Sequence, residues 1–177
     1  DPLELPDRHA FRNYVDGVFM GYKWQCVELA RRWLYVNRGL LLDDVGMAYD
    51  IFELRSVRVV GSDERRALQA FRNGVPRRPE PGSLLVWDEG GHFERTGHVA
   101  VITAVRNDAV HVIEQNNEDV VWPAGRDCSR VIDARIGADE SFWIEDGPGE
   151  TRILGWMTVT DDDAWAEPAV PVPEALF

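Results

Sequence analysis

The clearest periodic pattern of the chain lies between residues 21 and 39. Apolar positions recur there at helical spacing, at Val27, Ala30 and Leu34. Charged residues fall between them and predict a solvated face, formed by Glu28, Arg31, Arg32 and Arg38. Gly39 follows as a typical C-terminal stop. The pattern predicts an amphipathic helix that starts near Gln25.

Downstream, the periodicity changes from helical to alternating. A second helical stretch runs from about Asp44 to Leu54, and short β-branched segments separated by Gly, Pro, Asn and Asp follow it. They predict strands at Val57–Val60, Ser83–Trp87, His98–Val105, Val110–Glu114 and Ile153–Val159. Helices followed by strands indicate an α+β fold, in which N-terminal helices pack on an antiparallel β-sheet.

The domain boundaries follow from composition. With 177 residues the chain is long enough for one domain with its own core, which we place at residues 14–160. Residues 1–13 are polar with two prolines and predict an N-terminal arm, and residues 161–177 form an acidic, Pro-rich tail.

Charge and cysteine content narrow the classes of function. A formal net charge of -12 argues against binding of nucleic acid or an anionic membrane surface, and is compatible with cationic ligands or simply with solubility. No apolar run reaches the length of a membrane helix and no signal peptide is visible. Two cysteines are too few for a disulfide framework, so we expect a cytoplasmic protein.

Cys26 is the first candidate for chemistry because it falls at the predicted helix start. Free N–H groups and the helix dipole stabilise negative charge there and favour the nucleophilic thiolate. Lys23, just upstream, adds positive charge. By position alone, a small buried hydrophobic residue is an equally good interpretation of Cys26.

His98 and Glu114 are candidates to activate the thiol, and the hairpin between them constrains that role. His98 opens one predicted strand and Glu114 ends the next. A two-residue loop at Asn107-Asp108 pairs Val101 with Glu114 and places Glu114 on the face opposite His98, because side chains alternate along a strand. A shared face therefore requires an odd-numbered loop or a β-bulge. In that register Asn116 lies opposite His98 and is an alternative orienting residue.

These residue types together suit nucleophilic attack on an amide. A thiolate attacks the carbonyl, an imidazole handles the proton, and a carboxylate or amide orients the ring. Gln25, beside the candidate nucleophile, has an amide able to donate to an oxyanion together with the N–H of Cys26.

Six ordered segments carry a family resemblance. They read MGYKWQCVELARRWL, DVGMAYDIFEL, PGSLLVWDEGG, TGHVAVITAV, VIEQN and ILGWM. They resemble the CHAP class of cysteine amidohydrolases, and in particular the amidase domains of glutathionylspermidine synthetase/amidases, over roughly Tyr14 to Val159. The resemblance implies a papain-like fold with Cys26 as nucleophile, His98 as base and Glu114 completing the triad.

The resemblance also implies a substrate and a partner. The expected reaction is hydrolysis of a glutathionylspermidine-type amide through a thioester on Cys26, with release of a polyamine and without any cofactor. The related enzymes carry a synthetase domain, so a fused or separate synthetase is the expected partner. Two alternatives stay open: a peptidoglycan amidase or endopeptidase of the same class, or hydrolysis of another peptidyl amide. A third is a non-enzymatic module that has kept only the fold.

Further site residues are predicted more weakly. Arg31 is a candidate to meet a substrate carboxylate, Trp87 to line the cleft, Asp88 to attract an amine, and Asn116 to contact substrate. No paired His or Cys motif indicates a metal site, and Cys128 is expected to be a bystander.

Overall fold

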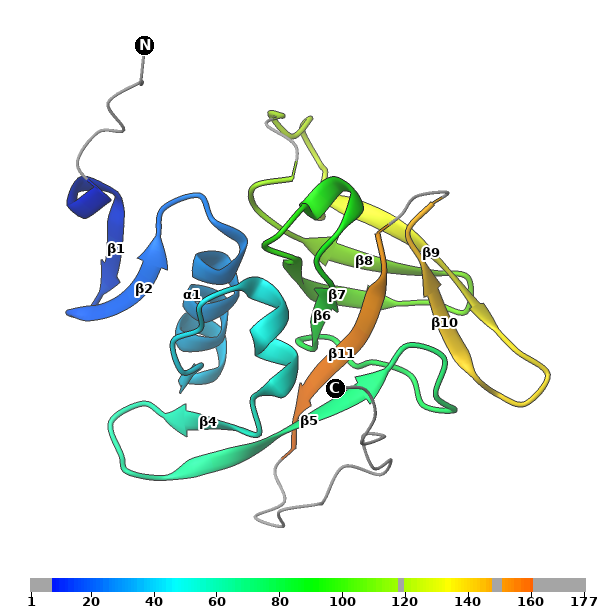
Figure 1. Ribbon diagram of the computed structural model, residues 1–177, viewed down its shortest axis with the longest axis horizontal. Coiled ribbons are helices and arrows are strands. Elements are labelled where there is room, and N and C mark those ends of the chain that lie inside the picture. Colours follow the sequence, from blue (N-terminus) through cyan, green and yellow to red (C-terminus); the bar gives the residue numbers. More distant parts are fainter. Residues whose placement is uncertain (1–7, 118–119, 148–150, 161–177) are drawn as a thin grey trace.

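The centre of the molecule is a nine-stranded antiparallel sheet (Figure 1). The computed structural model describes residues 8–117, 120–147 and 151–160. The strand order in the sheet is β10-β9-β8-β7-β6-β11-β5-β4-β3. The strands are β3 (Leu40–Leu41), β4 (Ser56–Val59), β5 (Arg65–Arg72), β6 (Leu84–Trp87), β7 (His98–Val105), β8 (Ala109–Ile113), β9 (Arg130–Ile136), β10 (Phe142–Glu145) and β11 (Ile153–Val159). The predicted antiparallel α+β class is confirmed at this level.

The helix α1 (Cys26–Arg38) forms where the pattern predicts it. Gln25 is its N-cap in extended geometry, and Gly39 is its C-cap with a φ of 61°. That left-handed conformation is one that glycine adopts without the cost of a Cβ, and the Gly39 N–H closes the last turn on the Leu34 and Tyr35 carbonyls.

The second predicted helix is shorter than expected. The segment forms only the 3-10 helix η2 (Ala48–Glu53), so α1 is the single α-helix in the part of the chain that the structure describes. Gly46 precedes η2 and Leu54 is already extended. Six residues leave too few hydrogen bonds to offset the nucleation of an α-helix.

Two apolar cores lie on opposite faces of the sheet. One packs α1 and η2 against the sheet, with Leu34, Ile51 and Val101 fully buried. The other lies inside the curl of the sheet and contains Ile102 and Trp156. The curl closes because residues 73–75, after β5, hydrogen-bond to β10: the Gly74 N–H donates to the Phe142 carbonyl at 2.9 Å and the Phe142 N–H donates to the Val75 carbonyl at 2.9 Å.

The predicted N-terminal arm is in part an ordered element. Strand β1 (Arg12–Val15) follows the 3-10 helix η1 (Arg8–Phe11) and pairs with β2 (Val18–Tyr22) in a hairpin on the outer side of α1 (Figure 1). The hairpin covers the face of α1 that the pattern predicted to be solvated. That prediction was wrong for Glu28 and Arg31, which are 2% and 4% exposed, because both charges have partners beneath the hairpin.

The predicted strands all form, with bounds shifted by one residue at most. Strands β1, β2, β3, β5, β9 and β10 were not predicted. Strands β5 and β9 carry several arginines, which obscure the alternation of their buried residues. None of the described helices is long and apolar enough to cross a membrane. The predicted tail at 161–177 lies outside the described residues.

Candidate active site

Cys26 is the first residue of α1 and is 8% exposed. Burial alone raises the pKa of its thiol, but a hydrogen bond from His98, the charge of His98 and the backbone N–H groups of Val99 and Val27 bring the pKa below the ordinary value of 9.0. The hydrogen bond and charge of His98, more than the helix start, therefore make this thiol ionise easily.

His98 begins β7 and is 1% exposed. The residue before it, Gly97, has a φ of 61°, and a Cβ there would lie 2.7 Å from the Trp87 carbonyl oxygen. Glycine thus allows the strand to start against the neighbouring backbone. The His98 ring stacks on Phe93 with centroids 4.3 Å apart and planes 8° apart, and Trp87 packs at 5.3 Å. These contacts fix the plane of the imidazole.

Glu114 completes the group. Its Oε2 accepts a hydrogen bond from His98 Nε2 at 2.8 Å, which leaves His98 Nδ1 as the ring nitrogen available to Cys26. Arg130 donates from Nε to Glu114 Oε1 at 2.9 Å, and Asn117 donates to the same oxygen at 3.0 Å. Burial raises the pKa of Glu114, but His98, Arg130 and Asn117 together lower it to about 2.

A β-bulge brings Glu114 to the face of His98. Near the hairpin loop, Val105 pairs with Val110 and Ala104 with His111, as a two-residue loop at Asn107-Asp108 requires. Thr103 is the extra residue, and beyond it Ile102 pairs with Val112. The register that follows places Glu114 on the same face as His98. The predicted requirement for an odd loop or a bulge is met by the bulge.

The three residues form a coupled charge system. Burial lowers the pKa of His98, but the hydrogen bonds and charges of Cys26 and Glu114 raise it above the ordinary value of 6.5. A thiol pKa that falls while the imidazole pKa rises favours a thiolate–imidazolium pair. Such a pair holds both the nucleophile and the proton that a leaving amine needs.

Gln25 and Asn116 meet beside the nucleophile. The Asn116 amide donates to the Gln25 side-chain oxygen at 3.1 Å. Glu114, and not Asn116, therefore contacts His98, and the alternative orienting role of Asn116 is ruled out by this geometry. The bond orients the exposed Gln25 amide and leaves its NH2 group available to donate.

Arg31 and Trp87 lie differently from the weaker predictions, whereas Asp88 stays near the site but has a partner. Arg31 is buried and donates to the Asp44 carboxylate at 2.7 Å, so its guanidinium is unavailable to a substrate. Trp87 is 0% exposed and supports His98 from the core. Asp88 forms an ion pair with Arg152 at the surface. Arg31 was predicted to meet a substrate but is held by its ion pair with Asp44. Trp87 was predicted to line the cleft but is buried in the apolar core.

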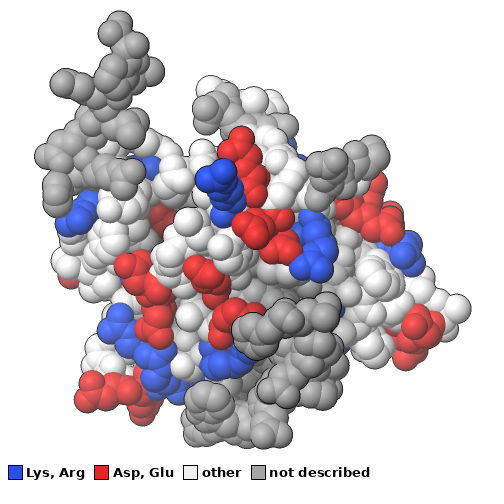
Figure 2. Space-filling view, in the orientation of Figure 1, with Lys and Arg blue, Asp and Glu red and all other residues white. Residues whose placement is uncertain are grey.

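An acidic rim lies near Tyr49, which packs on Gly97, the residue before His98. Burial raises the pKa of the Tyr49 hydroxyl, and the charges of Asp50, Glu89 and Asp88 raise it further, so these three carboxylates lie near Tyr49. Figure 2 shows acidic side chains over this side of the molecule, near η2 and the loop that follows β6. We call Asp50, Asp88 and Glu89 the acidic rim.

The supporting residues of Glu114 were missed in the sequence. Arg130 opens β9, sixteen residues after Glu114, and its Nη1 also donates to Asp146 at 2.5 Å. Asp146 in turn accepts a hydrogen bond from Trp87 Nε1 at 2.9 Å. Phe93, which stacks on His98, comes from the 3-10 helix η3 (Gly91–Phe93). No local motif marks these residues, because they come from separate elements: the pairing of β8 with β9 brings in Arg130, and η3 brings in Phe93.

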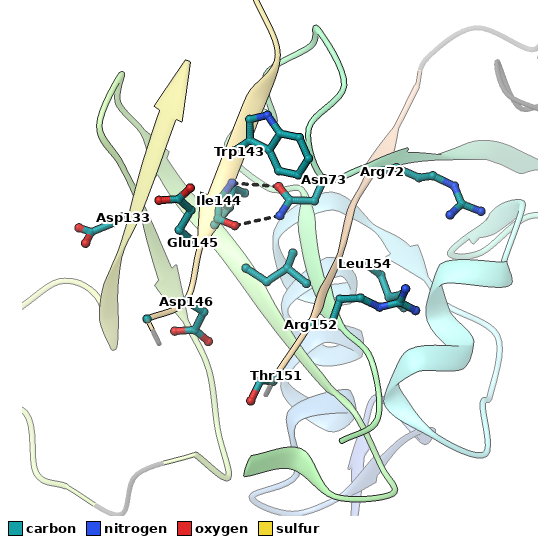
Figure 3. A pocket seen from close by; sticks show the side chains of 12 residues that line it. Arg72, Asn73, Asp133, Trp143, Ile144, Glu145, Asp146, Thr151, Arg152 and Leu154 are labelled. Atoms are coloured by element: carbon teal, nitrogen blue, oxygen red, sulfur yellow. Dashed lines mark hydrogen bonds between the residues drawn. The ribbon is translucent and has the colours of Figure 1, made fainter. Parts of the chain in front are cut away.

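A separate cavity of ≈ 630 Å³ opens between β10 and β11 (Figure 3). Asp146, Arg152 and Trp143 line it, and Asn73 bridges its wall through paired hydrogen bonds of 2.9 Å to the Ile144 backbone. Neither Cys26 nor His98 reaches this cavity. Asp146 links the cavity to the active site through its ion pair with Arg130 and its hydrogen bond from Trp87 Nε1.

Comparison with known proteins agrees with this site. The CHAP domain family model matches residues 17–116, more than half of the chain. The chain is 45% identical over 98% of its length to the bifunctional glutathionylspermidine synthetase/amidase of Escherichia coli, of which it spans 28%. It is 36% identical over 90% of its length to the trypanothione synthetase of Crithidia fasciculata, of which it spans 24%.

The chain therefore belongs to the CHAP domain family. It is a cysteine amidase of that class.

Proposed function

We propose that this amidase hydrolyses a glutathionylspermidine-type amide and releases the polyamine. The observation that carries the proposal is the acidic rim beside the triad. Asp50, Asp88 and Glu89 lie near Tyr49, which packs against the residue before His98, and of these Asp88 is also paired with Arg152. A polyamine is a chain of ammonium groups, and a cluster of carboxylates near the scissile bond favours such a leaving group.

In the proposed mechanism Cys26 is the nucleophile. Its thiolate attacks the amide carbonyl and forms a tetrahedral intermediate, whose oxyanion receives hydrogen bonds from the Cys26 N–H and the Gln25 amide. His98 then gives its proton to the amine nitrogen, the C–N bond breaks, and a thioester remains on Cys26. His98, now neutral, takes a proton from water, which hydrolyses the thioester and regenerates the thiolate–imidazolium pair.

Glu114 acts as a positioning residue in this scheme. It accepts the His98 Nε2 hydrogen bond and so presents Nδ1 to the thiol. Its own ionised state is held by Arg130. A nucleophile on a helix and an imidazole on a sheet is the papain-like arrangement, and we assign residues 14–160 to that catalytic domain.

The relatives extend the proposal to a partner. The matched proteins are several times longer than this chain, and the Escherichia coli protein is named as both synthetase and amidase. We infer that this amidase works together with a synthetase, fused or separate, that makes the amide it cleaves.

The test is spermidine release from glutathionylspermidine, followed chromatographically. We expect release by the wild type and none by Cys26→Ala, with a covalent glutathionyl adduct trapped on Cys26 of the wild type by acid quenching. Glu64→Gln, an exposed carboxylate far from the triad in sequence, is the control and should match wild type.

Replacement of the acidic rim tests the substrate assignment separately. Asp88→Asn together with Glu89→Gln should raise KM for the polyamine amide, and should leave hydrolysis of an uncharged glutathione amide unchanged. Equal effects on both substrates would remove the rim from recognition. Cleavage of peptidoglycan in place of the polyamine amide would favour the alternative cell-wall activity of the CHAP class.

A further inference from the structure

A second group of reactive side chains lies where β8 meets the segment that precedes β9. His111, Asp127 and Cys128 each place one donor atom within 4.8 Å of the other two. This is the only such group of three or more His, Cys, Asp and Glu side chains found in residues 8–117, 120–147 and 151–160. It shares no residue with the triad, and no sequence motif marks it because the donors come from two separate segments.

The fold holds the two segments in position without help from a ligand. The Ser129 N–H donates to the Val112 carbonyl at 2.8 Å, which joins the segment to β8 beside His111. Arg126 donates from Nε to the Cys128 carbonyl at 2.7 Å and fixes the turn before β9. Cys128 is 6% exposed, whereas Asp127 is exposed and His111 is half-buried, so the group has one buried donor and an open side.

The donor set selects a class of metal ion. A thiolate and an imidazole disfavour Mg²⁺ and Ca²⁺, and with a carboxylate they suit a borderline ion in tetrahedral geometry. In a tetrahedral zinc site with bonds of about 2.0–2.3 Å the donor atoms are about 3.5 Å apart, so small side-chain rotations are sufficient. The His111 imidazole takes part in no hydrogen bond within the described parts of the chain.

We propose that His111, Asp127 and Cys128 bind one Zn²⁺, with water as the fourth ligand. The two residues after Cys128 support the triad: Ser129 Oγ accepts from the Glu114 N–H at 2.8 Å, and Arg130 binds the Glu114 carboxylate. The metal ties β8 to this supporting segment. It therefore stiffens the position of Glu114 from outside the cleft.

The experiment uses the full chain with Cys26→Ala, so that Cys128 is the only thiol. Titration with Co²⁺ should give a thiolate-to-cobalt charge-transfer band that saturates at one equivalent and that Zn²⁺ abolishes. A further Cys128→Ser change should remove the band. His111→Ala should weaken Zn²⁺ binding by at least about tenfold, as measured by competition with a chromophoric chelator. Losing even an outer-shell partner of a metal typically lowers metal affinity by about that factor.

His92→Ala in the same background is the control and should bind Zn²⁺ as the parent does. Zn²⁺ should also raise the Tm of the parent and of the control, and should leave that of the Cys128→Ser protein unchanged; circular dichroism checks that each variant is folded. Absence of a band in the parent, or unchanged Zn²⁺ affinity in a folded His111→Ala protein, would overturn the site. No turnover is measured, so this result is independent of the proposed amidase substrate.

Discussion

Two cysteines with different surroundings show how local environment sets reactivity. Burial raises the pKa of both thiols, and at Cys128 the neighbouring Asp127 raises it further. At Cys26 the positive charge of His98 reverses the effect of burial. The same residue type is therefore a nucleophile at one position and, in the metal-free protein, a neutral thiol at the other.

Selective alkylation tests this difference. Below pH 9.0, the ordinary thiol pKa, Cys26 should react with iodoacetamide much faster than Cys128, because only the thiolate is nucleophilic and Cys26 keeps a thiolate to lower pH. Mass spectrometry of peptides from a pH series measures both rates. His98→Ala should move the Cys26 profile to higher pH. Equal rates at the two cysteines in the wild type would argue against a low-pKa Cys26.

Glu114 gives a second prediction at this scale. Glu114→Gln should lower kcat by about 10²–10⁴-fold, because the imidazole loses the anion that fixes its tautomer and stabilises its charged form. On the alkaline side of the pH–rate profile, the rate of the variant should begin to fall at a lower pH than that of the wild type, since the pKa of His98 is no longer raised by a carboxylate. Glu64→Gln is the matched control. An unchanged profile would make Glu114 merely structural.

At the scale of elements, the hairpin β1–β2 changes what α1 exposes. Asn13 donates to Glu28 Oε1 at 2.6 Å, and Arg32 donates from Nε to the same oxygen at 2.7 Å. Gly21 lets the hairpin approach, because a Cβ there would lie 3.2 Å from the Glu28 Cβ. A helix face that is polar in sequence is in this way buried, and its charges are paired.

Replacement of Glu28 should therefore destabilise the protein. Glu28→Ala should lower the free energy of unfolding by about 1–3 kcal/mol, because the half-buried Asn13 and Arg32 lose the acceptor that the buried Glu28 gives them. Urea unfolding followed by circular dichroism measures the change. Glu64→Ala, at an exposed site, should change it by less than about 0.5 kcal/mol. A Glu28→Ala protein as stable as the wild type would mean that the hydrogen bonds of Glu28 with Asn13 and Arg32 add no stability.

At the scale of the whole molecule, the ionised Glu114 couples stability to pH. Its pKa is 4.5 in an ordinary setting and about 2 in the folded protein. A depressed carboxyl pKa stabilises the fold above pH 4.5, and this stabilisation is lost as the pH falls towards 2.

Acid titration tests this coupling. The wild type should lose about 3 kcal/mol of unfolding free energy through Glu114 over that interval, the equivalent of its pKa shift. The Glu114→Gln protein should lack this component, so the difference in stability between the two proteins should shrink with acidification. Urea unfolding at a series of pH values measures it. A difference that stays constant from neutral pH to pH 2 would contradict the low pKa.

Elements with a strong local signal are predictable from the amino-acid pattern. The ends of α1 follow from Gln25, the apolar spacing and Gly39, and β7 follows from the β-branched run after His98. Position alone left Cys26 equally well explained as a small buried residue, and the segments that resemble the CHAP class were what nominated Cys26, His98 and Glu114 together. Side-chain alternation along a strand also predicted that the hairpin between His98 and Glu114 needs a β-bulge or an odd-numbered loop, because that alternation is a fixed geometric rule.

The remaining features depend on how distant segments pack together. The register of the hairpin is shifted by a β-bulge at Thr103. Because of this bulge, the interior-facing residues Ile102 and Val105 are three positions apart instead of two. Arg130 supports Glu114, and Cys128 approaches His111, because β8 and β9 pair. The charges of Glu28 and Arg31 are buried because a hairpin folds over them. Each of these depends on contacts between distant segments, which no local pattern encodes.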